Sequence, residues 1–215
     1  MHKQRVILIV AIVLGVGYGW LGGAFVGFGP ATVVAGQSAA RPGLQKAIFA
    51  AGCFWCVESD FDKVAGVVST TSGYTGGRVA NPTYEQVSAG GTGHVEAVEI
   101  QFDPARVTYE QLLDHFWHNV DPFAANRQFC DIGDQYRPEI FVLNDAQRAA
   151  AEASKKRMQE RFSQPIVVKI TQAGPFYRAE AYHQDYYKTH SVQYRYYRWR
   201  CGRDDRLEAI WRGRT

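Results

Sequence analysis

The chain has 215 residues, of which 46% are hydrophobic, so it can build one ordinary domain with an appendage. Its formal net charge is +3, and Lys3 and Arg5 in the leading segment account for two of those charges, which leaves +1 for the rest. This near neutrality excludes the strongly basic surface that non-specific nucleic-acid binding requires. Basic and aromatic residues do alternate over 194–200, but we interpret this run as a partly buried terminal segment whose arginines reach solvent.

The first forty residues differ in composition from everything that follows. No charged residue occurs between Val6 and Ala40, and a helix that spans a bilayer needs roughly 20 apolar residues. The positive flank before this stretch predicts a cytoplasmic N-terminus, and Ser38-Ala39-Ala40 resembles a small-residue cleavage site. We therefore expect residues 1–40 to be a signal anchor or a cleaved signal peptide. The domain at 41–215 would then be membrane-anchored or exported.

The next feature is a short strand that ends at a glycine and a cysteine. Lys46 to Ala50 is mostly apolar, which predicts a buried strand. After Gly52, apolar residues recur at spacings of three and four from Phe54 to Val64, which predicts a helix. Cys53 then lies at the helix N-terminus, where unpaired N–H groups and the helix dipole favour the thiolate. We interpret Cys53 as a nucleophile; the alternative is a small buried residue at a strand–helix joint.

The cysteines set limits on the chemistry of the chain. A single C-x-x-C motif, without a second pair, is a poor signature for structural zinc, so we expect no metal. In an oxidising compartment these thiols can form disulfides, and counting them does not separate structural bridges from catalytic ones. The four residues are Cys53, Cys56, Cys130 and Cys201.

A carboxylate marks the third predicted strand. Val67 to Tyr74 predicts the second strand, and a glycine-rich loop at 88–94 leads to the third, from Val95 to Phe102. Glu96 shares a face with the apolar residues of that strand, which is the expected core face. Burial of a carboxylate is costly and raises its pKa, so Glu96 is a candidate general acid. The alternative is an edge position at which the strand has already left the core.

The second half of the chain alternates helices and strands. Thr108 and Gln111 form a capping box that begins a helix extending to about Val120. The long loop at 126–137 is dense in polar, aromatic and cysteine residues, which is typical of functional loops. A strand at 140–143, a helix to about 162 and a strand at 167–171 follow. The alternation predicts an α/β fold, a two-layer sandwich in which helices cover a mixed β-sheet.

From about Lys46 to its end, the chain resembles the peptide methionine sulfoxide reductase A family. The resemblance omits the leader. It implies that 41–215 is a catalytic domain and that its mixed sheet has a ferredoxin-like core. The motifs that carry it are Gly52-Cys53-Phe54-Trp55 with Glu58, Gly73-Tyr74 with Asn81-Pro82-Thr83-Tyr84, Thr92-Gly93-His94-x-Glu96, Asp121-Pro122, Asp131-x-Gly133-x-Gln135-Tyr136-Arg137, and Ala181-Tyr182-His183-Gln184.

The resemblance implies reduction of methionine S-sulfoxide, free and in proteins, as a repair under oxidative stress. Cys53 would attack the sulfoxide sulfur, and Glu96 would protonate or hydrogen-bond the oxygen, which otherwise leaves with full negative charge. Phe54 and Trp55 would hold the S-methyl group, although each could also be ordinary core packing. Trp55 lies off the apolar helix stripe, which favours the pocket role. The polar side of the pocket would consist of Tyr84, Asp131 and Tyr136.

A resolving thiol is also implied. Attack leaves Cys53 as a sulfenic acid, which a second cysteine converts to a disulfide, and an external thioredoxin-type dithiol would reopen that bond. Cys56, Cys130 and Cys201 all compete for this role, and we favour Cys201 because a terminal tail can swing towards the pocket. The family often has glycine at the position of Cys130, and its C-terminal cysteines vary. The resemblance implies a monomer without a bound cofactor.

Two other classes of function stay open at this point. A C-x-x-C motif at a helix start after a strand is typical of thiol–disulfide oxidoreductases, but it does not explain Glu96, Tyr84 or the loop at 131–136. A membrane-anchored binding module stapled by cysteines is the second alternative. In such a module Cys53 would be permanently bridged.

Overall fold

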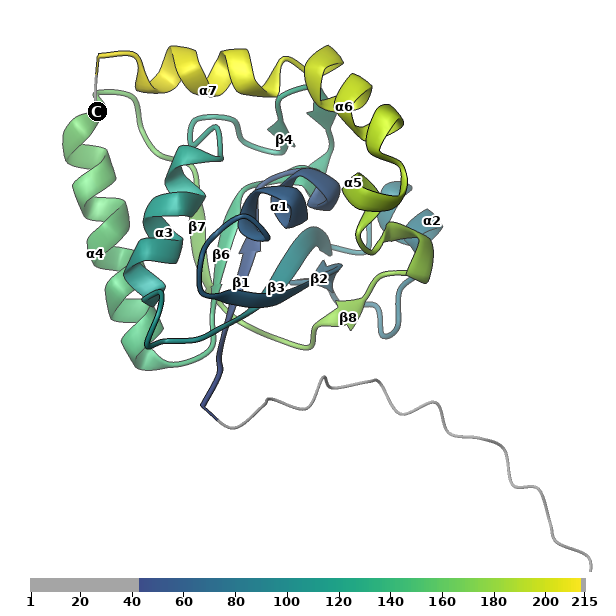
Figure 1. Ribbon diagram of the computed structural model, residues 1–215, viewed down its shortest axis with the longest axis horizontal. Coiled ribbons are helices and arrows are strands. Elements are labelled where there is room, and N and C mark those ends of the chain that lie inside the picture. The colour runs from purple at the N-terminus through teal and green to yellow at the C-terminus, as the bar shows by residue number, and fades with distance from the viewer. Residues whose placement is uncertain (1–42, 214–215) are drawn as a thin grey trace, which may run out of the picture. The chain divides into compact units, whose positions relative to one another are not determined.

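A six-stranded sheet lies at the centre of the domain, with strand order β7-β6-β1-β3-β2-β8 (Figure 1). This computed structural model describes residues 43–213, so the expected leader at 1–40 lies outside the described residues. Among these strands β6 and β7 pair in parallel and the other neighbours are antiparallel, so the sheet is mixed, as predicted. The strands are β1 (Gln45–Ala50), β2 (Val67–Thr75), β3 (Val95–Phe102), β6 (Glu139–Val142), β7 (Lys169–Gln172) and β8 (Tyr177–Arg178).

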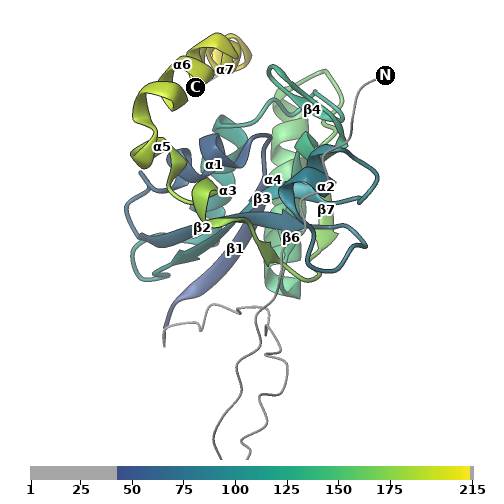
Figure 2. The same cartoon turned by 90° about the vertical axis from the view of Figure 1, so that its right-hand side faces the viewer.

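Helices flank one face of this sheet (Figure 2), and their apolar residues join those of the strands in the main core. Phe49 of β1 stacks on Phe61 and on Phe116, with ring centroids 5.2 Å apart in both pairs. These two partners come from different helices, so a single strand residue joins both helices to the sheet. The helices are α1 (Phe54–Phe61), α3 (Tyr109–His118) and α4 (Asp145–Arg161).

The opposite face of the sheet carries a smaller core. Ile48, Val95 and Phe141 are buried there, and Ala173 and Phe176 from connecting segments pack against them. The interior strand β3 is therefore covered on both faces. A polar side chain on this strand has little access to water, whichever face it occupies.

Capping boxes begin two helices of this domain, one of which was predicted from the sequence and one of which was not. Thr108 and Gln111 begin α3 in the predicted manner. Thr83 and Gln86 make the same reciprocal bonds and begin α2 (Tyr84–Ser88), a short helix that the sequence analysis does not predict. The Thr-x-x-Gln pattern was the available signal for this helix.

Most predicted boundaries lie within a residue or two of the observed ones. The strand predicted at 167–171 begins two residues later, as β7, because the N–H of Val167 donates to the carbonyl of Pro122 instead of joining the sheet. The loop predicted at 126–137 contains some regular structure of its own. It holds a hairpin of β4 (Arg127–Gln128) and β5 (Asp131–Ile132), followed by the turn η1 (Asp134–Tyr136).

The C-terminal segment is helical and lies over one end of the domain (Figure 1). The basic and aromatic run at 194–200 falls within α6; Tyr194 is buried and Arg195 is exposed, as expected, whereas Arg198 is mostly buried. Within residues 43–213, no helix combines the length and the apolar character that crossing a bilayer requires. The elements are η2 (Ala181–His183), α5 (Tyr186–Thr189), α6 (Ser191–Arg200) and α7 (Arg203–Trp211).

Candidate active site

The site is built at the turn between β1 and α1. Gly52 has φ +86°, and a Cβ placed there would lie 2.5 Å from the Cβ of Gln128, so both the backbone and the close approach require glycine. Gln128 is fully buried, and its amide bonds the backbone N–H and carbonyl of Asp121, both at 2.8 Å. Cys53 follows the glycine as the N-cap residue of α1, where the sequence places it.

β3 brings Glu96 to this turn. Its Oε2 accepts the backbone N–H of Phe54 at 3.0 Å, and so satisfies one of the unpaired donors at the start of α1. Glu96 is 3% exposed. Burial raises its pKa to about 8, against the opposing effect of the Phe54 hydrogen bond. The structure thus places Glu96 on the core face and not at a strand edge, and it is mostly protonated at pH 7.

Cys53 and Cys56 are free thiols, and both are buried. Burial raises the pKa of Cys53 well above its ordinary value, and its hydrogen bond with Cys56 and the charge of Glu96 act in the same direction. The pKa of Cys56 is lowered, first by that hydrogen bond and then, against its burial, by the nearby charges of Arg203 and Arg198. The sequence predicts the thiolate at Cys53, whereas here desolvation outweighs the helix terminus.

A buried group of charges lies beside Cys56. Asp60 accepts a hydrogen bond from Nη1 of Arg198 at 2.8 Å, and its Oδ2 lies 3.5 Å from Nη2 of Arg203. Arg203 is 2% exposed and donates to the carbonyl of Ala51 at 3.2 Å. It therefore ties α7 to the residue that precedes the catalytic turn, and it brings a positive charge close to the Cys56 sulfur.

Aromatic rings line the start of α1. Trp55 stacks on Tyr186 with ring centroids 3.8 Å apart, and its Nε1 donates to Nδ1 of His183 at 3.1 Å. The His183 ring also lies 4.9 Å from Phe54 and 4.5 Å from Tyr84, measured between centroids. His183 thus joins the three aromatic residues that the family resemblance assigns to substrate binding.

The predicted polar residues share an electrostatic environment with Glu96. Burial raises the pKa of both Tyr84 and Tyr136, and the charges of Glu96 and Asp131 add to the effect in each case. Both hydroxyl groups therefore stay neutral and remain hydrogen-bond donors. Asp131 accepts a hydrogen bond from the Tyr197 hydroxyl at 2.6 Å, and burial raises its pKa. Segments far apart in the sequence therefore meet in one electrostatic environment.

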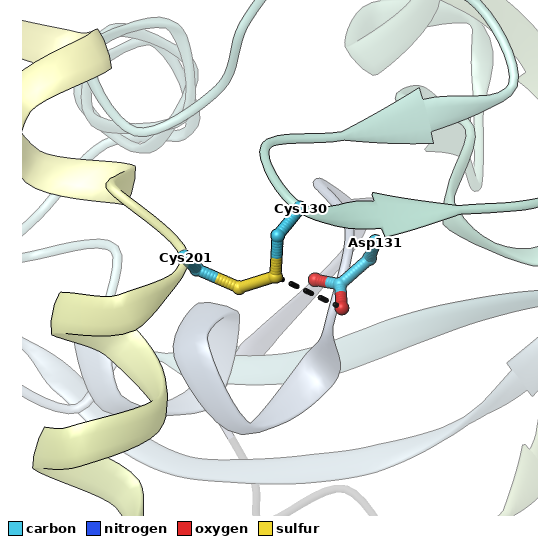
Figure 3. Close-up of side chains that lie close together, drawn as sticks. All are labelled: Cys130, Asp131 and Cys201. Carbon is cyan, nitrogen blue, oxygen red and sulfur yellow. Dashed lines mark hydrogen bonds between the residues drawn. A yellow bond between two sulfur atoms is a disulfide. The ribbon is translucent and has the colours of Figure 1, made fainter.

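A second sulfur centre lies beside Asp131 (Figure 3). Cys130, between β4 and β5, and Cys201, which caps α6, form a disulfide with Cα atoms 4.9 Å apart. The Sγ atom of Cys130 lies 3.7 Å from Oδ1 of Asp131. Cys130 is exposed and Cys201 is half-buried. This centre is therefore accessible from solvent, unlike the thiols of Cys53 and Cys56.

The tail that carries Cys201 is held at several points. The sequence analysis favours Cys201 as the resolving cysteine because a terminal tail can swing towards the pocket. In the structure this tail is fixed by side-chain contacts, so that reason is not supported. Cys201 is already bonded to Cys130, whereas Cys56 hydrogen-bonds Cys53 directly. The contacts that hold the tail are the side-chain hydrogen bonds Tyr197–Asp131, Arg198–Asp60 and Arg206–Asp121.

Sequence reasoning assigned no role to Glu180 or His183. Glu180 accepts the Tyr74 hydroxyl and the Tyr84 backbone N–H, both at 2.8 Å, and so positions Tyr84. Both residues lie in or next to the Ala181-Tyr182-His183-Gln184 motif. The sequence offered one sign that these two residues are functional. A carboxylate and an imidazole stand in or beside a segment that matches the family, and that segment has no apolar periodicity to explain it as core packing.

The free thiol of Cys53 bears on one of the two alternative functions. A cysteine-stapled binding module requires a bridged Cys53, and the structure contradicts this. A thiol–disulfide oxidoreductase is compatible with the two adjacent thiols. It leaves a buried, protonated Glu96 beside them without a use.

Comparisons with known proteins identify the family. The family model "Peptide methionine sulfoxide reductase" matches residues 45–215. The peptide methionine sulfoxide reductase MsrA of Listeria welshimeri is 48% identical over 175 residues, which cover 80% of this chain and 99% of the relative. Reduced Mxr1 from Saccharomyces cerevisiae, at 29% identity, superposes with a TM-score of 0.67 over 70% of this chain and 88% of that one. Methionine sulfoxide reductase A of Corynebacterium diphtheriae, at 31% identity, gives a TM-score of 0.63 over 69% and 76%. The chain belongs to the peptide methionine sulfoxide reductase family.

Proposed function

We propose that this protein reduces methionine S-sulfoxide, free or within proteins, to methionine. The observation that carries the proposal is the buried Glu96 carboxyl, which has a pKa of about 8 and bonds the N–H of Phe54, the residue after Cys53. A sulfoxide oxygen needs a proton in order to leave, and a carboxyl group that stays protonated at neutral pH supplies one. The family membership supports the same reaction.

Cys53 is the proposed nucleophile. The two adjacent thiols titrate as a pair, so one proton leaves below the ordinary thiol pKa and the other well above it. Transfer of the remaining proton from Cys53 to Cys56 across their hydrogen bond makes Cys53 the thiolate. Its attack on the sulfoxide sulfur, with a proton from Glu96 to the oxygen, reduces the substrate by two electrons. Cys53 is oxidised by two electrons to the sulfenic acid as methionine leaves.

The remaining site residues would orient the sulfoxide. The faces of Phe54 and Trp55 suit its S-methyl group, which is apolar and polarizable. The neutral hydroxyls of Tyr84 and Tyr136 would donate hydrogen bonds to the oxygen as charge develops there. Asp131, bonded to Tyr197, would complete the polar side of the site.

The direct test is reduction of a blocked methionine sulfoxide by the full-length protein with dithiothreitol. We expect the S epimer to be reduced, the R epimer to be left intact, and Cys53→Ser to have no detectable activity, because the thiolate is lost. Chiral chromatography of the two epimers measures the outcome. Turnover of the S epimer by Cys53→Ser, or equal turnover of both epimers, contradicts the proposal.

Glu96 should determine the alkaline limb of the pH profile. Because the carboxyl must be protonated, kcat/KM for the S epimer should fall as pH rises through about 8. Glu96→Gln keeps the shape but cannot give up a proton, so it should lose kcat/KM by about 10²-fold or more and lose this limb. Glu99→Gln, on the other face of β3, is the matched control. An unchanged alkaline limb in Glu96→Gln would assign that limb to another group.

We further propose that Cys56 resolves the sulfenic acid. Attack of the Cys56 sulfur on the Cys53 sulfur forms their disulfide and releases the oxygen as water. The hydrogen bond between the two thiols and the nearby charge of Arg203 support this assignment. The Cys130 and Cys201 thiols, when reduced, would then exchange with the new disulfide and carry the oxidation to the surface.

Oxidation of resolving-cysteine variants by one equivalent of substrate separates the candidates. In Cys56→Ser, methionine should form more slowly, because Cys56 no longer takes the proton of Cys53. The Cys53 sulfenic acid should then persist and react with dimedone, because its nearest partner is gone. Cys201→Ser should keep the oxidation as the Cys53–Cys56 disulfide, whereas the fully reduced parent should pass it on to the Cys130–Cys201 pair. Peptide mapping by mass spectrometry reads both results. A bridge from Cys53 to Cys201 in the oxidised parent would restore the tail as the resolving element.

Two finer assignments also belong to this proposal. Four strands follow the chain order β-α-β-β-α-β and lie in the order β6-β1-β3-β2, which supports a ferredoxin-like core.

The uncharged stretch from Val6 to Ala40 supports a leader that anchors or exports the domain. A phosphatase reporter that is active only outside the cytoplasm, fused after residue 40, should be active. Activity confined to a cytoplasmic reporter would exclude export.

A further inference from the structure

The helix α6 exposes a continuous apolar stripe. Val192, Tyr196 and Trp199 recur at spacings of four and three, so they share one face, and their exposed fractions are 67%, 62% and 71%. Tyr194 is buried and Tyr197 is half-buried, so the opposite side of the helix faces the domain. An apolar patch with a polar rim, left uncovered on a folded domain, is typical of an interaction surface.

The rim of this stripe is positively charged. The sequence of α6 contains three arginines and no acidic residue. Arg198 is neutralised by Asp60 and Asp204, but Arg195 and Arg200 are exposed and have no ion pair with any described carboxylate. We define the α6 face as the five exposed apolar and basic residues of this helix. These are Val192, Arg195, Tyr196, Trp199 and Arg200.

The helix that carries this face, α6, ends at Cys201 of the disulfide (Figure 3). Trp199 precedes Cys201 by two residues, and Ile132, which is 73% exposed, follows Cys130 by two residues. Two residues of chain reach at most about 7 Å, so an exposed apolar residue lies near each of the two bridged cysteines. A cavity of about 410 Å³ adjoins Cys201, and its lining includes Arg206.

The two sulfur centres differ in their access to a macromolecule. Cys53 and Cys56 are 6% and 2% exposed, so a protein thiol cannot reach them without rearrangement. Cys130 is an exposed residue, so a protein thiol can approach it from solvent. Electrons from a protein donor must therefore enter at the surface disulfide.

We propose that the α6 face is the docking surface for a protein dithiol reductant of the thioredoxin type, whose reactive thiol is surrounded by apolar residues and an acidic rim. The inference rests on the proposed function, because oxidised Cys53 needs outside electrons. The apolar stripe matches the apolar surroundings of the incoming thiol, and Arg195 and Arg200 match its acidic rim. The stripe leads the partner to the bond that it must reduce.

The exchange balances in atoms and electrons. A thiolate of the reductant attacks the exposed Cys130 sulfur, the Cys130–Cys201 bond breaks, and Cys201 leaves as a thiolate. The second thiol of the reductant then attacks its own sulfur in the mixed disulfide and releases Cys130. The reductant ends as a disulfide, and its two protons are left on Cys130 and Cys201.

A lipid surface is the other occupant that aromatic and basic residues suggest. Its placement is unfavourable, because β1 begins at the end of the domain opposite to α6 and α7 (Figure 1). The chain that would lead to a membrane anchor therefore joins the domain at the end remote from the α6 face. The reductant, in contrast, has its target at the edge of this face.

The test measures how fast reduced thioredoxin opens the Cys130–Cys201 disulfide in the full-length protein, without any sulfoxide. Acid quenching, alkylation and mass spectrometry give the second-order rate constant. In Tyr196→Ser/Trp199→Ser, and separately in Arg195→Glu/Arg200→Glu, this constant should fall at least fivefold. The rate with dithiothreitol should stay within twofold of the parent, because a small dithiol needs no docking surface. Val68→Ser, which removes an exposed apolar residue from β2, should resemble the parent with both reductants.

A fall of less than fivefold with thioredoxin in either double variant overturns the proposal, as does an equal loss with dithiothreitol. If the thioredoxin rate is retained while binding to phosphatidylglycerol vesicles is lost, the α6 face belongs to a lipid surface. Because no substrate is present, this result is independent of the proposed sulfoxide chemistry. Absence of S-sulfoxide reduction by the parent would refute that chemistry alone.

Discussion

The removal of water from the turn between β1 and α1 is the constraint on which the site depends. β3 is covered on both faces, so Glu96 is buried, and the N–H of Phe54 gives it one defined partner. The same burial that keeps this carboxyl protonated also raises the pKa of Cys53. Burial therefore makes Glu96 a proton donor but disfavours the thiolate of Cys53. Another group in the site must make that thiolate accessible.

Cys56 and the arginines of the C-terminal helices provide that group. Arg203 reaches from α7 to the carbonyl of Ala51, and Arg198 from α6 to Asp60, so the tail both closes the site and supplies positive charge to it. The charge favours an anion on Cys56, which shares a hydrogen bond with Cys53. Cys53 and Cys56 are buried, whereas the disulfide of Cys130 and Cys201 lies at the surface. This separation suits sulfoxide reduction at the buried pair and thiol exchange with an external reductant at the surface.

Periodicity and turn signals were sufficient for the elements that hold the reactive groups. The 3.6-residue spacing placed Cys53 at the start of α1, and alternation placed Glu96 on the core face of β3. The balance of pKa effects at Cys53 was not predictable, because it depends on burial and on arginines about 150 residues away, which periodicity does not report. The contacts that fix the C-terminal helices, and the contacts of His183 with the site aromatics, were not predictable for the same reason. Both come from contacts between distant segments.

The surface disulfide has a consequence for the unfolded ensemble. It joins residues separated by 71 positions, so it closes a large loop in the denatured chain. In the chain-entropy model a loop of this length is worth about 4 kcal/mol of conformational stability. Reduction of the bond therefore changes the resistance of the domain to heat and proteolysis as well as its electron content. The reduction potential of the compartment then affects the conformational stability of the domain.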